Sequence, residues 1–217
     1  MIGRNKKFAI ISVSDKKNID KIANALIQQD YNILSTGGTA KFLTSKNIPN
    51  ISISKFTKFD EILEGRVKTL HPIIHAGILA KDEKALKDIK NTSYSLIDMV
   101  IVNLYPFEEV ISKKNCKFND AIENIDIGGP TMLRAAAKNH NRVTVITDPN
   151  DYQRVIDEIK SKGSTTKSLR YKLALKVFSL ISKYDSAITN YLMEHSQTKE
   201  DLIPLKLNIV LEKENNL

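Results

Sequence analysis

One segment of the chain combines cations, a hydroxyl and a histidine in the way that an anionic substrate requires. GRVKTLHP at residues 65–72 places two cations and a threonine in a stretch without helical or strand periodicity. A rigid polar loop that carries two cations suits recognition of a phosphate or carboxylate. A solvated surface loop is the alternative, and this segment alone does not exclude it.

Two further segments carry small polar residues where anions are commonly bound. STGGTA at residues 35–40 puts a glycine pair between an apolar run and a helix-like segment, where backbone N–H groups bind anions. SVSDK at residues 12–16 follows another apolar run, and its Ser14 and Lys16 suit the same phosphate. A plain turn and a helix cap explain the two segments equally well. Neither matches a Walker A loop or a GxGxxG fingerprint, which disfavours an ATPase or a dinucleotide enzyme.

A carboxylate and a phenol complete the candidate chemistry. Asp126 precedes a glycine pair in IDIGGPTMLRAAAKNH at residues 125–140, and a carboxylate beside backbone donors suits a general acid or base. A helix cap is the alternative role for Asp126, and Lys138 near the helix end is favourable for dipole reasons alone. Tyr105 in NLYPF can bond a substrate or orient a lysine, although Tyr-Pro is more often only a turn.

His71 and His75 lie four residues apart, a spacing that a helix turns into a metal pair. Pro72 between them argues against that helix, and the sequence shows no third ligand. We therefore expect no metal site.

The elements that must position these groups alternate between strand and helix. Apolar runs predict strands at residues 8–13, 32–34, 51–53, 96–102 and 143–146. Asp15 is expected to cap the helix that follows the first strand, and Pro130 falls in the first turn of another. This order predicts a three-layer α/β/α fold with a mainly parallel sheet. Ligands bind beyond the carboxyl ends of such strands, so the turns after the first, second and 96–102 strands should line one crevice.

The C-terminal part begins with a long helix after Gly163. Its apolar stripe is typical of core packing or of a dimer face; it comprises Leu169, Leu173, Val177, Leu180, Tyr184, Ile188 and Tyr191. Residues 202–211 alternate apolar and polar side chains like a strand. A strand without a partner after it suggests a missing domain or an intermolecular pairing.

Composition limits the compartment and the partners. The 217-residue chain has 33 basic and 25 acidic side chains, a net charge of +8, and one cysteine, Cys116. A single cysteine excludes an internal disulfide framework and fits a reducing compartment. No apolar run approaches the roughly 18 residues that cross a bilayer. We expect a cytoplasmic protein that binds no membrane.

The basic excess by itself favours nucleic acid, but its distribution does not. Residues 1–72 hold 12 basic and 6 acidic side chains, and no dense basic run alternates with aromatic residues. We expect the charge to attract one phosphorylated small molecule, and we expect no nucleic-acid partner.

Taken together and in order, SVSDK, STGGTA, GRVKTLHP, NLYPF and IDIGGPTMLRAAAKNH closely resemble the N-terminal part of the bifunctional AICAR transformylase/IMP cyclohydrolase family. The resemblance runs from about residue 8 to residue 191. It departs at Lys17-Asn18, where the family commonly has Thr-Gly. The resemblance implies a methylglyoxal-synthase-like domain at residues 1–197 and a strand-like tail at 198–217, which leads to a transformylase domain that this chain lacks.

The activity implied is closure of 5-formamidoimidazole-4-carboxamide ribotide (FAICAR) to IMP with loss of water, without a cofactor. This is the last step of purine synthesis. Longer family members also formylate AICAR with 10-formyltetrahydrofolate in the domain that is missing here. A homodimer is expected.

Residue roles follow from the same resemblance. The catalytic set is Lys68, Tyr105, Asp126 and Lys138, with Lys68 at the reacting amide and bonded to Tyr105, Asp126 near the leaving oxygen, and Lys138 in proton transfer. The substrate-binding set contacts the phosphate, the ribose and the base and stabilises the oxyanion. It comprises Ser12, Ser14, Asp15, Lys16, Thr36, Gly37, Gly38, Thr39, Arg66, Val67, Thr69, Val102, Asn103, Ile127, Gly128 and Gly129.

Two other functions remain open. A methylglyoxal synthase shares the fold and a phosphate loop, although the GRVKTLHP and NLYPF segments do not favour it. A nucleotide-sensing module, such as the effector domain of carbamoyl-phosphate synthetases, would bind IMP without turnover and would have no use for the catalytic set.

Overall fold

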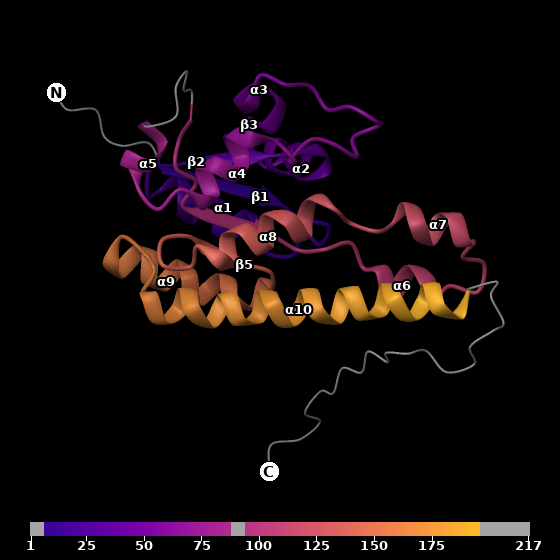
Figure 1. Cartoon of the computed structure of the whole chain (residues 1–217). Helices are drawn as coiled ribbons and strands as arrows, with labels where there is room; N and C mark the ends of the chain where they lie inside the picture. Colours follow the sequence, from indigo (N-terminus) through magenta and orange to yellow (C-terminus); the bar gives the residue numbers. More distant parts are fainter. Residues whose placement is uncertain (1–6, 88–93, 196–217) are drawn as a thin grey trace, which may run out of the picture. The chain divides into compact units, whose positions relative to one another are not determined.

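The computed structural model describes residues 7–87 and 94–195 (Figure 1). The chain divides into two compact units. The first combines the N-terminal part up to Leu104 with residues 126–178, and the second combines residues 105–125 with the chain from Ser179 onward.

The first unit is built on a five-stranded parallel sheet in the order β3-β2-β1-β4-β5. The strands are β1 (Lys7–Ser12), β2 (Tyr31–Ser35), β3 (Ile51–Ser52), β4 (Met99–Val102) and β5 (Thr144–Ile146). All four residues of β4 and the four central residues of β1 are buried. Strands covered on both faces need such continuous apolar runs, which confirms the α/β class predicted from the sequence.

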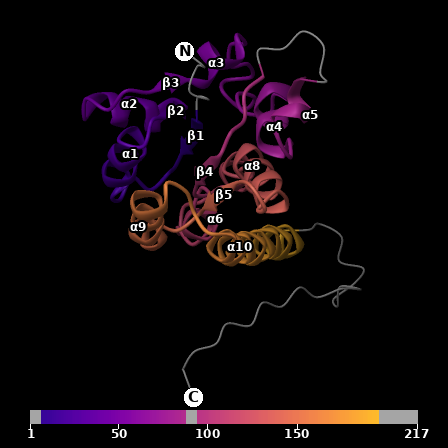
Figure 2. The same ribbon diagram turned by 90° about the vertical axis from the view of Figure 1, so that its left-hand side faces the viewer.

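Helices cover both faces of the sheet (Figure 2). Helix α1 (Ile19–Ile27) packs against α9 (Tyr152–Lys162) on one face, and α4 (Pro72–Leu79) packs against α8 (Gly128–Lys138) on the other. The remaining helical segments of this unit are α2 (Gly37–Ser45), α3 (Ile53–Thr57), α5 (Glu83–Lys87), the 3₁₀ turn η1 (Pro149–Asp151) and the first part of α10 (Lys167–Glu194).

The strand order reverses at β1, because β2 and β3 extend the sheet on one side and β4 and β5 on the other. The loops after β1 and β4 therefore leave the sheet side by side in opposite directions. Such a switch point is where ligands bind on open α/β sheets.

The start of α1 differs from the sequence prediction. Asp15 does not cap it: its carboxylate accepts the N–H of Lys17 at 2.9 Å, and Asn18 occupies the N-cap with a φ of 56°. Asparagine tolerates this left-handed conformation better than most residues. The left-handed conformation of Asn18 is one that glycine also adopts easily, and the family that the sequence resembles commonly has glycine at this position.

Two strand predictions were too long. The strand predicted at 96–102 begins at Met99, and Ile53, predicted to end a strand, begins α3. The hydroxyl of Ser52 accepts the N–H of Lys55 at 3.2 Å and so caps a helix at that point.

The second unit contains α6 (Phe107–Ile111), α7 (Phe118–Glu123) and the rest of α10. Phe107 contacts the rings of Tyr184 and Tyr191 edge-on, at centroid distances of 6.1 and 5.7 Å. Both tyrosines belong to the predicted apolar stripe of α10, and the stripe residues Leu169, Leu173 and Val177 are buried in the first unit. The stripe is therefore core; only Leu180 and Ile188 are half-buried. The predicted strand at 202–211 lies outside the described residues.

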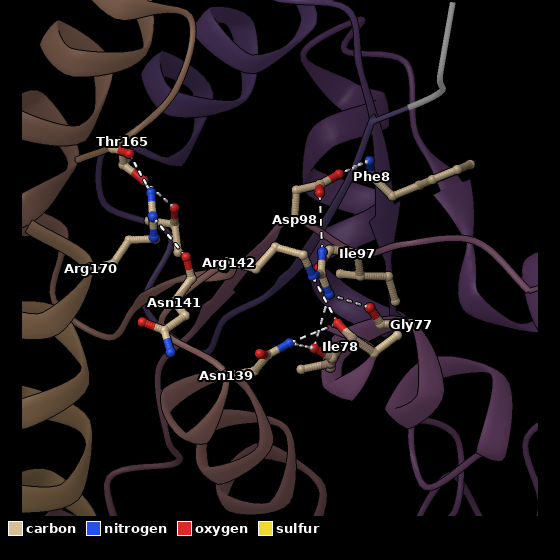
Figure 3. A network of polar contacts seen from close by, with 12 residues as sticks. Phe8, Gly77, Ile78, Ile97, Asp98, Asn139, Asn141, Arg142, Thr165 and Arg170 are labelled. Carbon is tan, nitrogen blue, oxygen red and sulfur yellow. Dashed lines mark hydrogen bonds and ion pairs between the residues drawn. The ribbon is translucent and has the colours of Figure 1, made fainter. Parts of the chain in front are cut away.

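A half-buried arginine, Arg142, fixes the amino-terminal edge of the sheet (Figure 3). Arg142 donates to the carbonyl oxygens of Gly77, Ile78, Ala80 and Ile97 at 2.7–3.1 Å, and to the Asp98 carboxylate at 3.2 Å. The other Asp98 oxygen accepts the N–H of Phe8 at 3.3 Å. Burial raises the pKa of Asp98, whereas the Phe8 N–H and Arg142 act in the opposite direction. This network joins the end of α4 to the starts of β1 and β4.

Arg142→Lys is expected to destabilise the protein by about 2–4 kcal/mol, because lysine keeps the charge but not the planar set of donors for these carbonyl groups. Urea unfolding followed by circular dichroism measures this change. Arg154→Lys, at an exposed position on α9, is the control and should change stability by less than about 0.5 kcal/mol. Equal midpoints for the two variants would contradict the role of the network.

Among the residues that the structure describes, no helix is long and apolar enough to span a membrane.

Candidate active site

The loops after β1 and β4 are joined through one asparagine at the switch point. The Oδ1 of Asn103 accepts the N–H and the hydroxyl of Ser14, at 2.7 and 2.8 Å, and the N–H of Asp15 at 3.2 Å. Its Nδ2 donates to the carbonyl of Asp15, and the Ser14 hydroxyl also lies 2.9 Å from the carbonyl of Leu104. Ser14 and Asn103 thus shape the loops, and the second N–H of the Asn103 Nδ2 is the part left for a ligand.

The loops after β1 and β2 are joined through hydroxyl groups. The Ser12 and Thr36 hydroxyls lie 3.0 Å apart, and the Thr39 hydroxyl accepts the N–H of Val13 and donates to its carbonyl, both at 3.0 Å. Thr39 is 3% exposed. Because the Thr39 hydroxyl already donates to the protein backbone, it cannot also donate to a phosphate as predicted. Its role in this structure is to connect the two loops.

The N-terminus of α2 is the best placed anion site of this edge. Gly37, with a φ of +46°, and Gly38 are both exposed and begin the helix. The Nζ of Lys16 lies 3.8 Å from the position that a Cβ on Gly38 would take. Two exposed backbone N–H groups, a lysine ammonium and the Thr36 hydroxyl together match the requirements of a phosphate.

The segment GRVKTLHP forms the second arm of a tight hairpin. Ile62 and Val67 exchange both backbone hydrogen bonds, at 3.1 and 3.3 Å, and Leu63 and Glu64 turn the chain with φ values of 53° and 55°. Gly65 follows with a φ of +84°, and the Nζ of Lys68 lies 3.7 Å from where its Cβ would be. The hairpin therefore folds the half-buried Lys68 side chain back over the turn.

The N-terminus of α8 meets the end of this segment. The Asp126 carboxylate accepts the N–H of Gly129 at 2.9 Å. A Cβ on Gly128 would lie 2.6 Å from the hydroxyl of Thr69, and a Cβ on Gly129 would collide with the Asp126 carboxylate and lie 3.0 Å from Leu104. The glycine pair is therefore required by close packing. It brings Asp126, Thr69 and the end of β4 together.

The predicted oxyanion donors are only partly supported by this arrangement. The N–H of Gly129 is used by Asp126, the N–H of Thr131 donates to Ile127, and Pro130 has none. The N–H of Gly128 is therefore the candidate donor at this helix end.

One predicted catalytic residue, Lys138, is not brought to this edge. Lys138 ends α8, and a helix of that length rises by about 15 Å between Gly128 and Lys138. Lys138 is exposed beside Asn139, which bonds Ile78 and Ala80 near the Arg142 network. Tyr105 is the first residue of the second unit, where it is 56% exposed, and its place beside Lys68 stays a prediction.

The remaining predicted residues lie along the same segments. Arg66 and Ile127 are exposed, whereas Val102 is a buried residue of β4 that can offer only its backbone. Sequence reasoning missed Glu61, whose carboxylate lies 3.6 Å from the same Cβ position on Gly65 as Lys68. An acidic residue four positions before the glycine was the only signal.

The two histidines occupy the start of a helix. Helix α4 begins at Pro72, so the expectation that this proline would prevent a helix here is wrong: proline fits a first helical position. The Nδ1 of His71 accepts the N–H of Ile73 at 3.2 Å. Within the described ranges, no group of three His, Cys, Asp or Glu residues is placed to hold a metal ion.

Burial lowers the pKa of His75, and its Nε2 is buried without a partner among the described residues. The unfolded chain therefore binds a proton more readily than the folded one. The stability that the neutral ring supports is present above about pH 6.5 and is lost as the pH falls below that value.

Accordingly, His75→Asn is expected to flatten the decline of the thermal midpoint between pH 7 and pH 5. His195→Asn, at an exposed histidine, should leave the decline unchanged. An equally steep decline in His75→Asn would refute this assignment.

Comparison with known proteins identifies the class first. The sequence profile of the MGS-like domain matches residues 18–131, just over half of the chain. The chain belongs to the MGS-like domain family. A second profile, AICARFT/IMPCHase bienzyme, matches residues 136–217.

Individual relatives are more specific than the family profile. Bifunctional purine biosynthesis protein PurH of Acetivibrio thermocellus is 50% identical over 209 residues, which cover 95% of this chain and 40% of that protein. The PurH of Caldicellulosiruptor saccharolyticus is 56% identical over 187 residues, covering 85% and 36%. The chain thus spans about 40% of the length of these curated relatives. The crystal structure of ForH superposes with a TM-score of 0.76 at 31% identity, covering 87% of this chain and all of ForH.

Proposed function

We propose that this chain is an IMP cyclohydrolase, which closes FAICAR to IMP with loss of water. The observation that carries the proposal is that three features lie at one edge of the sheet. They are the hairpin with Arg66 and Lys68, the Asp126 carboxylate that accepts the N–H of Gly129, and the glycine pair at the N-terminus of α2. The PurH relatives and the bienzyme profile support the assignment to purine synthesis. In enzyme classification this is a hydrolase of cyclic amidines that operates in the ring-closing direction.

The phosphate of the nucleotide is assigned to the N-terminus of α2. Gly37 and Gly38 offer exposed backbone donors, and Lys16 and Thr36 add a cation and a hydroxyl. Arg66 on the hairpin supplies a further exposed cation toward the ribotide. The positive net charge of residues 1–72 supports binding of an anion by this part of the chain.

Ring closure forms a bond between the carboxamide nitrogen and the formyl carbon. The carboxamide nitrogen loses one proton, and the formyl oxygen gains negative charge on attack. The formamide nitrogen loses a second proton as the C–O bond breaks, and the oxygen leaves as water with two protons. Holding the two reacting groups of one molecule against each other lowers much of the barrier. The remainder requires a donor for the oxygen and groups that move protons.

Lys68 is assigned to the reacting amide, and Asp126 to proton transfer at the departing oxygen. The N–H of Gly129 donates to one oxygen of the Asp126 carboxylate, and this hydrogen bond fixes the orientation of the carboxylate. The N–H of Gly128 supports the oxygen as it gains charge. Tyr105 is proposed to orient Lys68. Lys138 is not given a role at the reacting atoms, because α8 separates it from Asp126.

A cytoplasmic homodimer is the form that we propose for the working protein. Sedimentation of the purified chain tests the dimer.

Three assays on the purified chain test the function against its alternatives. A cyclohydrolase converts FAICAR to IMP in an absorbance assay. A methylglyoxal synthase forms methylglyoxal from dihydroxyacetone phosphate. A sensor binds IMP in calorimetry and shows no turnover in either reaction. We expect the first result, and either of the others would overturn the proposal.

A further inference from the structure

An exposed apolar stripe lies on α10, where this helix runs beside α8 in the first unit. Tyr171, Leu175 and Phe178 follow one another at helical spacing and are 54%, 53% and 43% exposed. The guanidinium of Arg134 on α8 lies 5.8 Å from the centroid of the Phe178 ring. His140, just after α8, meets the ring of Tyr171 edge-on at 5.6 Å. The stripe is therefore bordered by α8 along its length.

The border of the stripe is positively charged. Arg134 and Lys138 are both exposed and lie one turn apart on the same side of α8. Tyrosine, phenylalanine and arginine are enriched at protein interfaces, and exposed apolar patches mark interaction sites. We call this surface the α8/α10 face; it comprises Arg134, Lys138, Tyr171, Leu175 and Phe178. Its chemistry suits a protein surface on which apolar side chains stand among carboxylates.

The hairpin before Gly65 offers that combination. Residues 60–64 read Asp-Glu-Ile-Leu-Glu, and all five are exposed. We call this segment the hairpin tip. Residues 1–72 hold 12 basic and six acidic side chains, and three of the six acidic ones lie in the hairpin tip. The tip is thus a local acidic and apolar segment in the most basic part of the chain.

Leu63 makes the hairpin tip a candidate interface on a second ground. Leu63 and Glu64 both adopt the left-handed conformation, with φ values of 53° and 55°. This conformation costs free energy for such residues and persists where the surroundings fix the backbone. Leu63 is nevertheless 67% exposed, so the described part of the chain covers little of its side chain. A partner surface that buries Leu63 accounts for both observations.

We propose that the hairpin tip of one copy of this chain packs on the α8/α10 face of a second copy. The apolar side chains of the tip lie against the stripe, and its carboxylates lie beside Arg134 and Lys138. Opposite charges at such a contact set its register and its specificity. Every copy carries both surfaces, so a two-fold axis forms the contact twice and closes the assembly as a dimer.

The inference rests on the homodimer proposed above and names the surfaces that form it. It does not depend on the reaction that the chain catalyses. Because the same hairpin carries Arg66 and Lys68, the second copy packs beside the proposed active site.

The first test identifies the contact by cross-linking. Unlabelled and ¹⁵N-labelled chains are mixed in equal amounts and left to exchange, which native mass spectrometry verifies. A carbodiimide then joins carboxylates directly to neighbouring lysines. We expect a cross-link between residues 60–64 and Lys138, with about half of the linked pairs combining the two isotopes, as random pairing in a two-fold dimer requires.

Two outcomes would overturn the proposal. One is a monomeric chain, which removes the proposed homodimer as well. The other is a dimer in which this cross-link is absent or joins only peptides of the same isotope. In that case the homodimer stands, and this interface alone fails.

The second test reverses charges and measures the dimer Kd by sedimentation equilibrium. Glu64→Lys is expected to raise the Kd by at least about tenfold, because it sets a like charge beside Arg134 and Lys138. The double variant Glu64→Lys/Lys138→Glu should recover most of this loss, which a folding defect would not allow. Glu109→Lys, at an exposed position on α6, is the control and should leave the Kd within about twofold. An unchanged Kd in Glu64→Lys would overturn the proposal.

Discussion

Lys68→Ala is expected to lower the rate of FAICAR closure by about 10²–10⁴-fold, the range associated with losing a proton-transfer group. The hairpin places the lysine ammonium over Gly65, next to the segment where Thr69 meets the α8 N-terminus. Alanine removes the only charged group that the proposed mechanism places at the amide. The fold should be unaffected, because the Ile62–Val67 pair is made by the backbone. Initial rates, with circular dichroism as a check on folding, measure both effects.

Lys138→Ala is the matched control on a second lysine. Since Lys138 is exposed at the far end of α8, its removal should cost at least about tenfold less than the removal of Lys68. Retained turnover in Lys68→Ala would contradict the assignment. A larger loss in Lys138→Ala than in Lys68→Ala would contradict the placement of the reaction at this edge.

Asp126→Asn is expected to reduce the same rate by a comparable factor while leaving nucleotide binding within about threefold. Asparagine still offers an oxygen to the N–H of Gly129, so the start of α8 is kept. What is lost is the carboxylate that can take up and release a proton. Rates of closure and the Kd for IMP from calorimetry separate the two effects.

Asp148→Asn is the control for the capping role of Asp126, because Asp148 likewise accepts a backbone N–H, from Asn150 at 2.8 Å. It should leave turnover unchanged. If Asp126→Asn kept the rate, or if it lost IMP binding in proportion to the rate, Asp126 would be a structural cap and not a proton-transfer group.

The sheet was predictable from the sequence because its strands are buried on both faces. Residues 8–13 and 96–102 are apolar apart from Ser12 and Asp98, and β1 and β4 lie within about one to three residues of those limits. The ends were less predictable, since they depend on single hydrogen bonds. The hydroxyl of Ser52, for example, turns the chain from strand into α3.

The site was predictable as a set of segments but not as a set of contacts. The loops after β1, β2 and β4 meet at one edge, as expected for parallel strands, and Asn103 and Thr36 connect them. The roles of Thr39 and Ser14 were not readable, because their hydroxyls bond partners 26 to 90 residues away in the sequence.

Two features of the site differ in how far the sequence predicts them. The position of Lys68 over Gly65 depends on a turn at Leu63 and Glu64, and neither residue type signals a left-handed turn. The distance of Lys138 from Asp126, in contrast, follows from the helical rise alone. It could have been derived from the sequence once α8 was recognised as one helix.

The central claim is that this chain closes FAICAR to IMP. The most direct measurement incubates the purified chain with FAICAR and follows IMP by absorbance and chromatography, against the uncatalysed rate. We expect IMP formation that is proportional to protein concentration and that falls by about 10²–10⁴-fold in Lys68→Ala. IMP formation at the uncatalysed rate, with IMP binding intact, would contradict it.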